Sequence, residues 1–143
     1  MIEESQSRAF DWFAVNKLKL NMTKTSKVVF STYLQPTNNK VSFLGITFDP
    51  KRTWEIHISK ISRKLSKTIY LLRNLVKIVS FKVVKLAYFA LFQNILSYGI
   101  LIWGHSPHTK LIFRIQRRAV RMIANIRYRD DVKATFRELG ILT

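Results

Sequence analysis

The spacing of apolar positions changes along this chain from a helical to an alternating pattern. Residues 3–17 have apolar side chains such as Phe10 and Phe13 at helical spacing, which predicts a first helix with apolar contacts on that side. Residues 27–34 (KVVFSTYL) and 40–49 (KVSFLGITFD) are instead rich in β-branched and aromatic side chains, and the turn signal QPTNN separates them. We therefore expect two strands joined as a hairpin.

From Trp54 onward the apolar positions follow a helical period. One stripe at three- and four-residue steps predicts a long helix, and its members are Ile58, Ile61, Leu65, Ile69, Leu72 and Val76. A polar break at Ser80 separates it from a second helix over residues 83–98. That helix is apolar nearly all round, so we expect it to be central, and the glycines and proline of YGILIWGHSPH end it.

Two more helices are expected after that break, over residues 109–126 and 132–139. The apolar face of the longer one is predicted to consist of Leu111, Ile115, Ala119, Met122 and Ile126. The predicted fold class is therefore α+β and mostly α, with a helix and hairpin followed by a helical bundle. A lone hairpin is marginally stable in water, so its strands are expected to belong to a sheet with further strands elsewhere.

Composition adds a strong charge to this outline. The chain has 143 residues, enough for about one domain, and 25 Lys and Arg against 8 Asp and Glu give a net charge of +17. Such a chain is expected to bind a polyanion, with nucleic acid favoured over an anionic membrane surface and a generic basic protein as the alternative. There is no cysteine, and His57, His105 and His108 lack a metal-ligand spacing, so no metal site is predicted.

No secretion or membrane signal stands out. The N-terminus, MIEESQSRAFDW, is acidic and polar, unlike a signal peptide. The most apolar run, residues 83–103, is interrupted by Lys85, Gln93, Asn94 and Ser97, which favours a buried helix over a membrane span. We expect an intracellular protein of the nucleus or cytoplasm that is not secreted and has no membrane partner.

The basic residues concentrate on two of the predicted helices. Opposite the apolar stripe of the first bundle helix lie Lys60, Arg63, Lys64 and Lys67, and the third helix repeats the arrangement with Arg114, Arg117, Arg118 and Arg121. Between Trp54 and Arg129 the only acid is Glu55, whereas solubility alone would favour mixed charge. These faces are predicted to follow a phosphate backbone without reading sequence; an ordinary solvated face is the alternative.

Five segments along the chain form an ordered set of motifs: FDWFAVNKLKLNMTKT (10–25), VSFLGITFDPKRTWEIHI (41–58), SYGILIWG (97–104), IQRRAVRMI (115–123) and FRELGILT (136–143). Together they resemble the reverse transcriptases of non-LTR retrotransposons, transposable elements of which the jockey-like elements of insects are most similar. Each motif alone is weak, but five in the family's order cover nearly the whole chain. The resemblance implies a polymerase shaped like a right hand, with residues 1–53 as the end of the palm and residues 54–143 as a thumb-like bundle and connection.

The resemblance also assigns roles to residues. Lys24 would assist proton transfer to the pyrophosphate leaving group, and Phe43, Leu44 and Gly45 would form a primer-grip-like turn that holds the 3′ end of the growing strand. A glycine there would let backbone approach a ligand closely. From the residues alone, Phe43 and Leu44 would be hairpin core. Trp54 and His57 are expected to fix the first thumb helix.

The chain contains a sequence, Tyr128 to Asp131, that looks like the Tyr-x-Asp-Asp metal box of these polymerases. In the family that box precedes the primer grip, where this chain has no suitable acids; those present are Glu3, Glu4 and Asp11. We instead expect Asp130 to be the N-cap of the last helix and Asp131 to lie in its first turn. No complete catalytic site and no cofactor are predicted here, and Mg²⁺ is implied only for the intact family enzyme.

Two functions remain open from the sequence. One is a fragment of an RNA-directed DNA polymerase that contacts the template–primer duplex and is inactive alone. Its partners would be an RNA template, a DNA primer and the upstream polymerase portion. The alternative is a stand-alone basic RNA- or DNA-binding module without enzymatic activity. A membrane-surface helical protein is a weaker third hypothesis.

Overall fold

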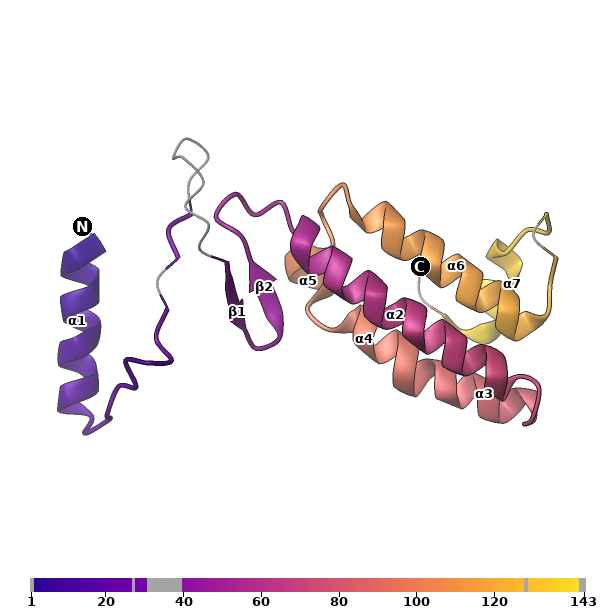
Figure 1. Cartoon of the computed structure of the whole chain (residues 1–143), viewed down its shortest axis with the longest axis horizontal. Helices are drawn as coiled ribbons and strands as arrows, with labels where there is room; N and C mark the ends of the chain where they lie inside the picture. The colour runs from indigo at the N-terminus through magenta and orange to yellow at the C-terminus, as the bar shows by residue number, and fades with distance from the viewer. Residues whose placement is uncertain (1, 27, 31–39, 128, 142–143) are drawn as a thin grey trace.

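The protein is mostly helical, with one small antiparallel hairpin, as the computed structural model shows (Figure 1). The structure describes residues 2–26, 28–30, 40–127 and 129–141. In chain order the elements are α1 (Ile2–Val15), β1 (Val41–Phe43), β2 (Ile46–Phe48), α2 (Glu55–Leu75), α3 (Phe81–Ala87), the π-helical segment η1 (Tyr88–Gln93), α4 (Asn94–Ser97), α5 (Ile100–Trp103), α6 (Thr109–Ala124) and α7 (Lys133–Leu139). The predicted α+β, mostly α class is confirmed.

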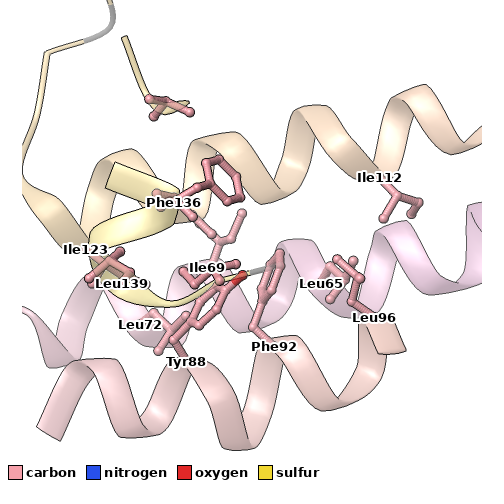
Figure 2. Close-up of a cluster of buried hydrophobic side chains, with 14 of the residues drawn as sticks. Leu65, Ile69, Leu72, Tyr88, Phe92, Leu96, Ile112, Ile123, Phe136 and Leu139 are labelled. Atoms are coloured by element: carbon pink, nitrogen blue, oxygen red, sulfur yellow. The ribbon is translucent and has the colours of Figure 1, made fainter. Parts of the chain in front are cut away.

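The long helix α2 forms the centre of the bundle. It packs against α6 on one side and against the α3–η1–α4 rod on another (Figure 1). The predicted apolar stripe is buried from Ile58 to Leu72, at most 6% exposed, while Val76 is partly buried at its end. Figure 2 shows side chains of this stripe meeting those of η1 and α7, with Phe136 and Leu139 closing the cluster.

The α3–η1–α4 rod begins after the break at Ser80, as predicted, but it is not central. Its buried side chains, Val84, Tyr88, Phe92 and Leu96, recur every four residues. In a regular α-helix, side chains four residues apart point about 40° away from each other around the helix axis. The wider π-helical turn of η1 offsets this rotation and keeps the four side chains on one face. The other face is exposed although it is apolar, with Leu86 at 70%. The expectation of an all-round buried helix is therefore wrong, because the rod covers only one side of the bundle.

The buried face of α6 is rotated from the predicted one. The side chains that enter the core are Ile112, Gln116, Ala119, Val120 and Ile123. Of the predicted set, Ala119 alone is fully buried; Ile115, Met122 and Ile126 are partly buried, and Leu111 is exposed.

A polar residue in the core explains this difference. The amide of Gln116 donates to the hydroxyl of Tyr88 (3.4 Å), which in turn donates to Gln93 Oε1 (3.0 Å). Burial raises the pKa of Tyr88 to about 12, so the hydroxyl keeps its proton. A pattern based on apolarity alone places Gln116 on the outside, whereas a hydrogen-bonded amide can be buried.

The first helix lies near its predicted boundaries. Figure 1 shows α1 standing apart from the bundle. Phe10 is 37% exposed and Trp12 57%, while the predicted contact residue Phe13 is partly buried with its ring 5.4 Å from that of Trp12.

The hairpin forms at a different place from the one predicted. Residues 40–49 do not form one strand; they fold back on themselves, with Val41 opposite Phe48 and Phe43 opposite Ile46. Residues 28–30 have no strand structure, and residues 31–39, which include the rest of the first predicted strand and the QPTNN turn, lie outside the described residues. The sheet in the described part of the chain has two strands, and β2 packs against α2.

The two aspartates before α7 stabilise the turn, but their roles differ from those predicted. The helix begins at Lys133 with Val132 at the N-cap position, so Asp130 is not the N-cap and Asp131 precedes the first turn. Asp131 Oδ1 accepts the backbone N–H of Lys133 (2.9 Å), and Asp130 Oδ2 accepts that of Arg127 (2.9 Å). A carboxylate thus accepts the first N–H of α7, but from Asp131 in the turn before the helix, and the predicted N-cap at Asp130 is wrong.

Searching the described residues for a helix both long enough and apolar enough to cross a membrane finds none.

Candidate nucleic-acid interface

One side of α6 carries the four predicted arginines. Arg114, Arg117 and Arg118 are exposed, and Arg121 is partly buried. The guanidinium of Arg117 lies over the ring of Phe113, 5.9 Å from its centroid, and Phe113 stacks on Phe136 of α7 (6.2 Å between centroids). The contact orients the Arg117 side chain and anchors it to the bundle.

These arginines line an open groove of about 1140 Å³ between α6 and the C-terminal end of α2. We call it the basic groove. Among the described residues, its basic side chains are Arg73, Lys77, Arg114, Arg117, Arg118, Arg121 and Arg129. Arg73 and Lys77 are four residues apart near the end of α2, so helical spacing in the sequence could have identified them as neighbours on one side. Arg129 could not be placed there by helical spacing, because it lies in the loop after α6.

The rest of the groove lining is apolar or acidic. Val76, Ile115, Met122 and Ile126 contribute apolar atoms and pack partly against the core. Among the described residues the acids that line the groove are Asp130 and Asp131, and both have a carboxylate oxygen turned to a backbone N–H. Seven basic side chains against two carboxylates leave an excess of five positive charges along one concave surface.

The basic residues predicted on α2 do not join this groove. Lys60 and Lys64 line a smaller pocket of about 250 Å³ beside the hairpin. Arg63 and Lys67 are exposed and line neither concavity. The two predicted basic clusters therefore share neither the basic groove nor the smaller pocket.

The predicted primer-grip residues form the tip of the hairpin. Leu44 (φ 48°) and Gly45 (φ 78°) are the two loop residues between the strands, and positive φ at both positions is what a type I′ hairpin turn needs. A Cβ at Gly45 would have its nearest contact at 3.9 Å, so conformation rather than space favours glycine. Phe43 and Leu44 are 63% and 69% exposed, so they are not hairpin core.

The hairpin contacts the segment between α4 and α5 at two points. The hydroxyl of Tyr98 donates to the carbonyl oxygen of Leu44 (2.6 Å), which ties the turn to the end of α4. At Gly99 (φ 66°) an added Cβ would lie 2.7 Å from Ile46 Cδ1, so the side chain of Ile46 in β2 would have to shift. The tip is therefore exposed but fixed in place.

Asp49 forms the joint between β2 and α2, a role that the sequence analysis missed. Its carboxylate accepts hydrogen bonds from Thr53 N, Thr53 Oγ1 and Trp54 N at 2.9 to 3.0 Å. Burial by itself would raise the pKa of Asp49, but these hydrogen bonds outweigh it and the pKa is lowered. They also hold Trp54 in a left-handed conformation (φ 64°) immediately before α2.

His57 makes the second link in this joint. It is 3% exposed, and its Nδ1 accepts the backbone N–H of Thr47 (3.2 Å), with Trp54 and Trp103 against the ring. Burial, followed by the positive charges of Lys60 and Lys64, lowers its pKa. The contacts of both Trp54 and His57 agree with the predicted role of fixing the start of this helix.

Lys24 lies away from both concavities. It is exposed in a turn in which Asn21 Oδ1 accepts the N–H groups of Thr23 (3.1 Å) and Lys24 (3.3 Å). The segment from Asn21 to Lys24 is therefore a turn closed by the Asn21 side chain, and no ion pair of Lys24 is seen among the described residues.

Asp130 and Asp131 of the apparent metal box lie in the turn between α6 and α7. Tyr128 lies outside the described residues, and the carboxylates of Asp130 and Asp131 are engaged with backbone N–H groups. Within the described ranges, no three His, Asp or Glu side chains are grouped as a metal ion would require.

Comparison with known proteins finds no matching family model, no matching curated protein and no matching solved structure.

Proposed function

We propose that this chain binds the sugar–phosphate backbone of nucleic acid in the basic groove between α2 and α6. The observation that carries the proposal is the excess of five positive charges along one continuous concave surface. Lys and Arg side chains that neutralise phosphates supply affinity that does not depend on base sequence.

The spacing of the arginines suits a polynucleotide. Arg114 and Arg121 are seven residues apart on α6, or about 10 Å along the helix axis. That length exceeds the rise of about 3.4 Å per nucleotide along a duplex axis, so the arginines can contact more than one phosphate. The groove volume also exceeds the roughly 300–1,000 Å³ of pockets for small molecules. Cations along a concave surface fit an inserted backbone strand better than a flat membrane surface.

The resemblance to non-LTR reverse transcriptases suggests what the bound nucleic acid is. In that family the corresponding helices contact a duplex of RNA template and DNA primer, so we propose an RNA–DNA duplex as the ligand. The exposed tip, Phe43 to Gly45, is proposed as the primer-grip-like contact. Since Asp130 and Asp131 are engaged with backbone, we propose duplex contact rather than nucleotide addition as the function of this chain.

Fluorescence anisotropy with a labelled RNA–DNA duplex tests the proposal. Affinity should fall steeply between about 50 and 200 mM salt, because binding releases counterions from the phosphates. The variant Arg114→Gln/Arg118→Gln should bind more weakly and lower the slope of log affinity against log salt by about two, close to one unit for each lost phosphate contact.

The matched control is Lys19→Gln/Lys82→Gln, which removes the same charge from exposed positions outside the groove. It should leave the salt slope nearly unchanged. An equal loss in both variants would mean that net charge alone drives binding and would contradict the groove. Incorporation of nucleotide by the purified chain in Mg²⁺ would contradict the non-catalytic function.

A further inference from the structure

A second concavity lies beside the hairpin turn and shares none of its described lining residues with the basic groove. It encloses about 250 Å³, which is smaller than the roughly 300 Å³ at which pockets for drug-sized ligands begin. We call it the hairpin pocket. Its lining consists of Gly45, His57, Lys60, Ile61, Lys64, Asn94, Ile95 and Tyr98.

His57, one of the residues that line this pocket, has an unused hydrogen-bond donor. Its Nδ1 accepts from Thr47 N–H, so the neutral ring carries its proton on Nε2. Nε2 is buried and has no hydrogen-bond partner among the described residues. A buried N–H group without an acceptor costs free energy, and such groups are rare in folded proteins. Among the described residues no oxygen or nitrogen atom accepts this donor, so an acceptor from outside the chain could satisfy it.

The charges around His57 indicate that the missing acceptor is an anion. Lys60 and Lys64 lie one turn apart on α2, and both act on the ring strongly enough to lower its pKa after the effect of burial. No acid is among the described residues that line the pocket. The hydroxyl of Tyr98 is already donated to Leu44 O, while the exposed amide of Asn94 adds a further polar group at the rim.

We propose that the hairpin pocket binds one phosphate group, held by the ammonium groups of Lys60 and Lys64 and by the Nε2–H of His57. Charge-assisted hydrogen bonds to phosphate oxygens would satisfy the buried donor and offset the repulsion between the two lysines. The phosphate could be free or could belong to a nucleic acid. This inference goes beyond binding in the basic groove, because phosphate could occupy the hairpin pocket even if the groove bound no nucleic acid.

Titration of the intact chain with inorganic phosphate at constant ionic strength tests the site by NMR of the histidine side chains. The chain has three histidines, and the spectrum of His57→Asn assigns the His57 signal. Phosphate should shift the His57 signal in a saturable way and raise its pKa, while the exposed His105 and His108 serve as internal references. Absence of a saturable His57 shift would overturn the proposal.

Two double variants that each remove two positive charges from α2 distinguish phosphate binding in the hairpin pocket from attraction by net charge. Lys60→Gln/Lys64→Gln should weaken phosphate binding at least about tenfold, since it removes two charged hydrogen-bond donors. Arg63→Gln/Lys67→Gln removes the same charge outside the pocket and should change binding less than about twofold. An equal effect of both pairs would overturn the site. All four positions are exposed, and circular dichroism would verify that both variants fold.

Oligonucleotides distinguish the source of the phosphate. If the ligand is a terminal phosphate, a 5′-phosphorylated strand should bind more tightly than its 5′-hydroxyl form, and Lys60→Gln/Lys64→Gln should abolish the difference. If inorganic phosphate binds but the terminal phosphate adds nothing, the site serves free phosphate or an internal backbone phosphate. Either result supports a phosphate site in the hairpin pocket.

Discussion

Two buried side chains, Asp49 and His57, connect the hairpin to the start of α2. The carboxylate of Asp49 organises the backbone that leads into α2, and the ring of His57 accepts a hydrogen bond from the neighbouring strand. Both are buried and both have lowered pKa values, but the causes differ. Hydrogen bonds favour the charged form of Asp49, whereas burial and two lysines disfavour the charged form of His57.

The lowered pKa of His57 predicts a loss of stability in mild acid. The ordinary pKa is 6.5, so below that value the unfolded chain binds a proton that the folded chain binds only at lower pH. The free energy of unfolding should therefore decrease as pH falls through 6.5 towards the folded-state pKa. Urea unfolding at about pH 7.5 and about pH 5.5 measures the difference.

A matched variant isolates this effect. His57→Asn keeps an acceptor for Thr47 N–H but does not titrate, so its stability should change less over the same interval. Asp49 does not confound the comparison, because its ordinary pKa is 3.8 and its contribution is lost only at lower pH. If wild type and variant lost equal stability, His57 would not be the responsible group.

At the scale of elements, α6 has two functional sides. One side enters the core through Ile112, Gln116 and Val120, and the other presents arginines to the groove. The residues expected to be core, Ile115, Met122 and Ile126, lie between the two and line the groove. The rotation of the helix thus decides both which residues stabilise the bundle and how far the arginines stand from α2.

Truncation of two apolar side chains on α6 distinguishes the observed from the expected rotation. Ile123 is 4% exposed, so Ile123→Ala should lower the free energy of unfolding by about 2–5 kcal/mol through lost burial and a cavity. Leu111 is 44% exposed, so Leu111→Ala should cost roughly 1 kcal/mol or less. Chemical denaturation of both variants makes the comparison, and a larger loss for Leu111→Ala would contradict the described packing.

For the whole molecule, the bundle and hairpin form one packed unit and α1 lies apart from it. The unit includes the described chain from residue 40 to residue 141, joined by the contacts of α2 with β2, α4 and α6. Residue Phe30 also reaches the hairpin, where its ring is 6.4 Å from that of Phe48 and under the guanidinium of Arg52. By contrast, Trp12 and Val15 of α1 are exposed.

This separation predicts that α1 contributes little to the stability of the bundle. Removal of residues 1–26 should shift the thermal unfolding midpoint by less than about 4 °C, which corresponds to a change below about 1 kcal/mol for a domain of this size. Differential scanning calorimetry of both chains measures the shift. A drop much larger than this would show that α1 packs against the bundle in solution.

The sequence pattern predicted which segments are helical better than it predicted which side of each helix is buried. The stripe from Ile58 to Leu72 and the break at Ser80 were correct, because helical period and polar interruptions are local properties. The position of the hairpin was wrong, because Leu44 adopts a positive φ that is uncommon for leucine and that its sequence does not signal. Likewise, the sequence showed the arginines of α6, but only the packed structure shows that Arg73, Lys77 and Arg129 line the same groove.

The sequence by itself determined the helical content, the charge and the resemblance that suggests a nucleic-acid partner. These follow from residue types and their local order. Only the tertiary structure decided that Lys60 and Lys64 line a different concavity from the arginines of α6, that Gln116 is buried, and that His57 has an unsatisfied donor. The physical reason is that burial and the meeting of charges depend on which faces of distant helices pack together, and local spacing does not specify that choice.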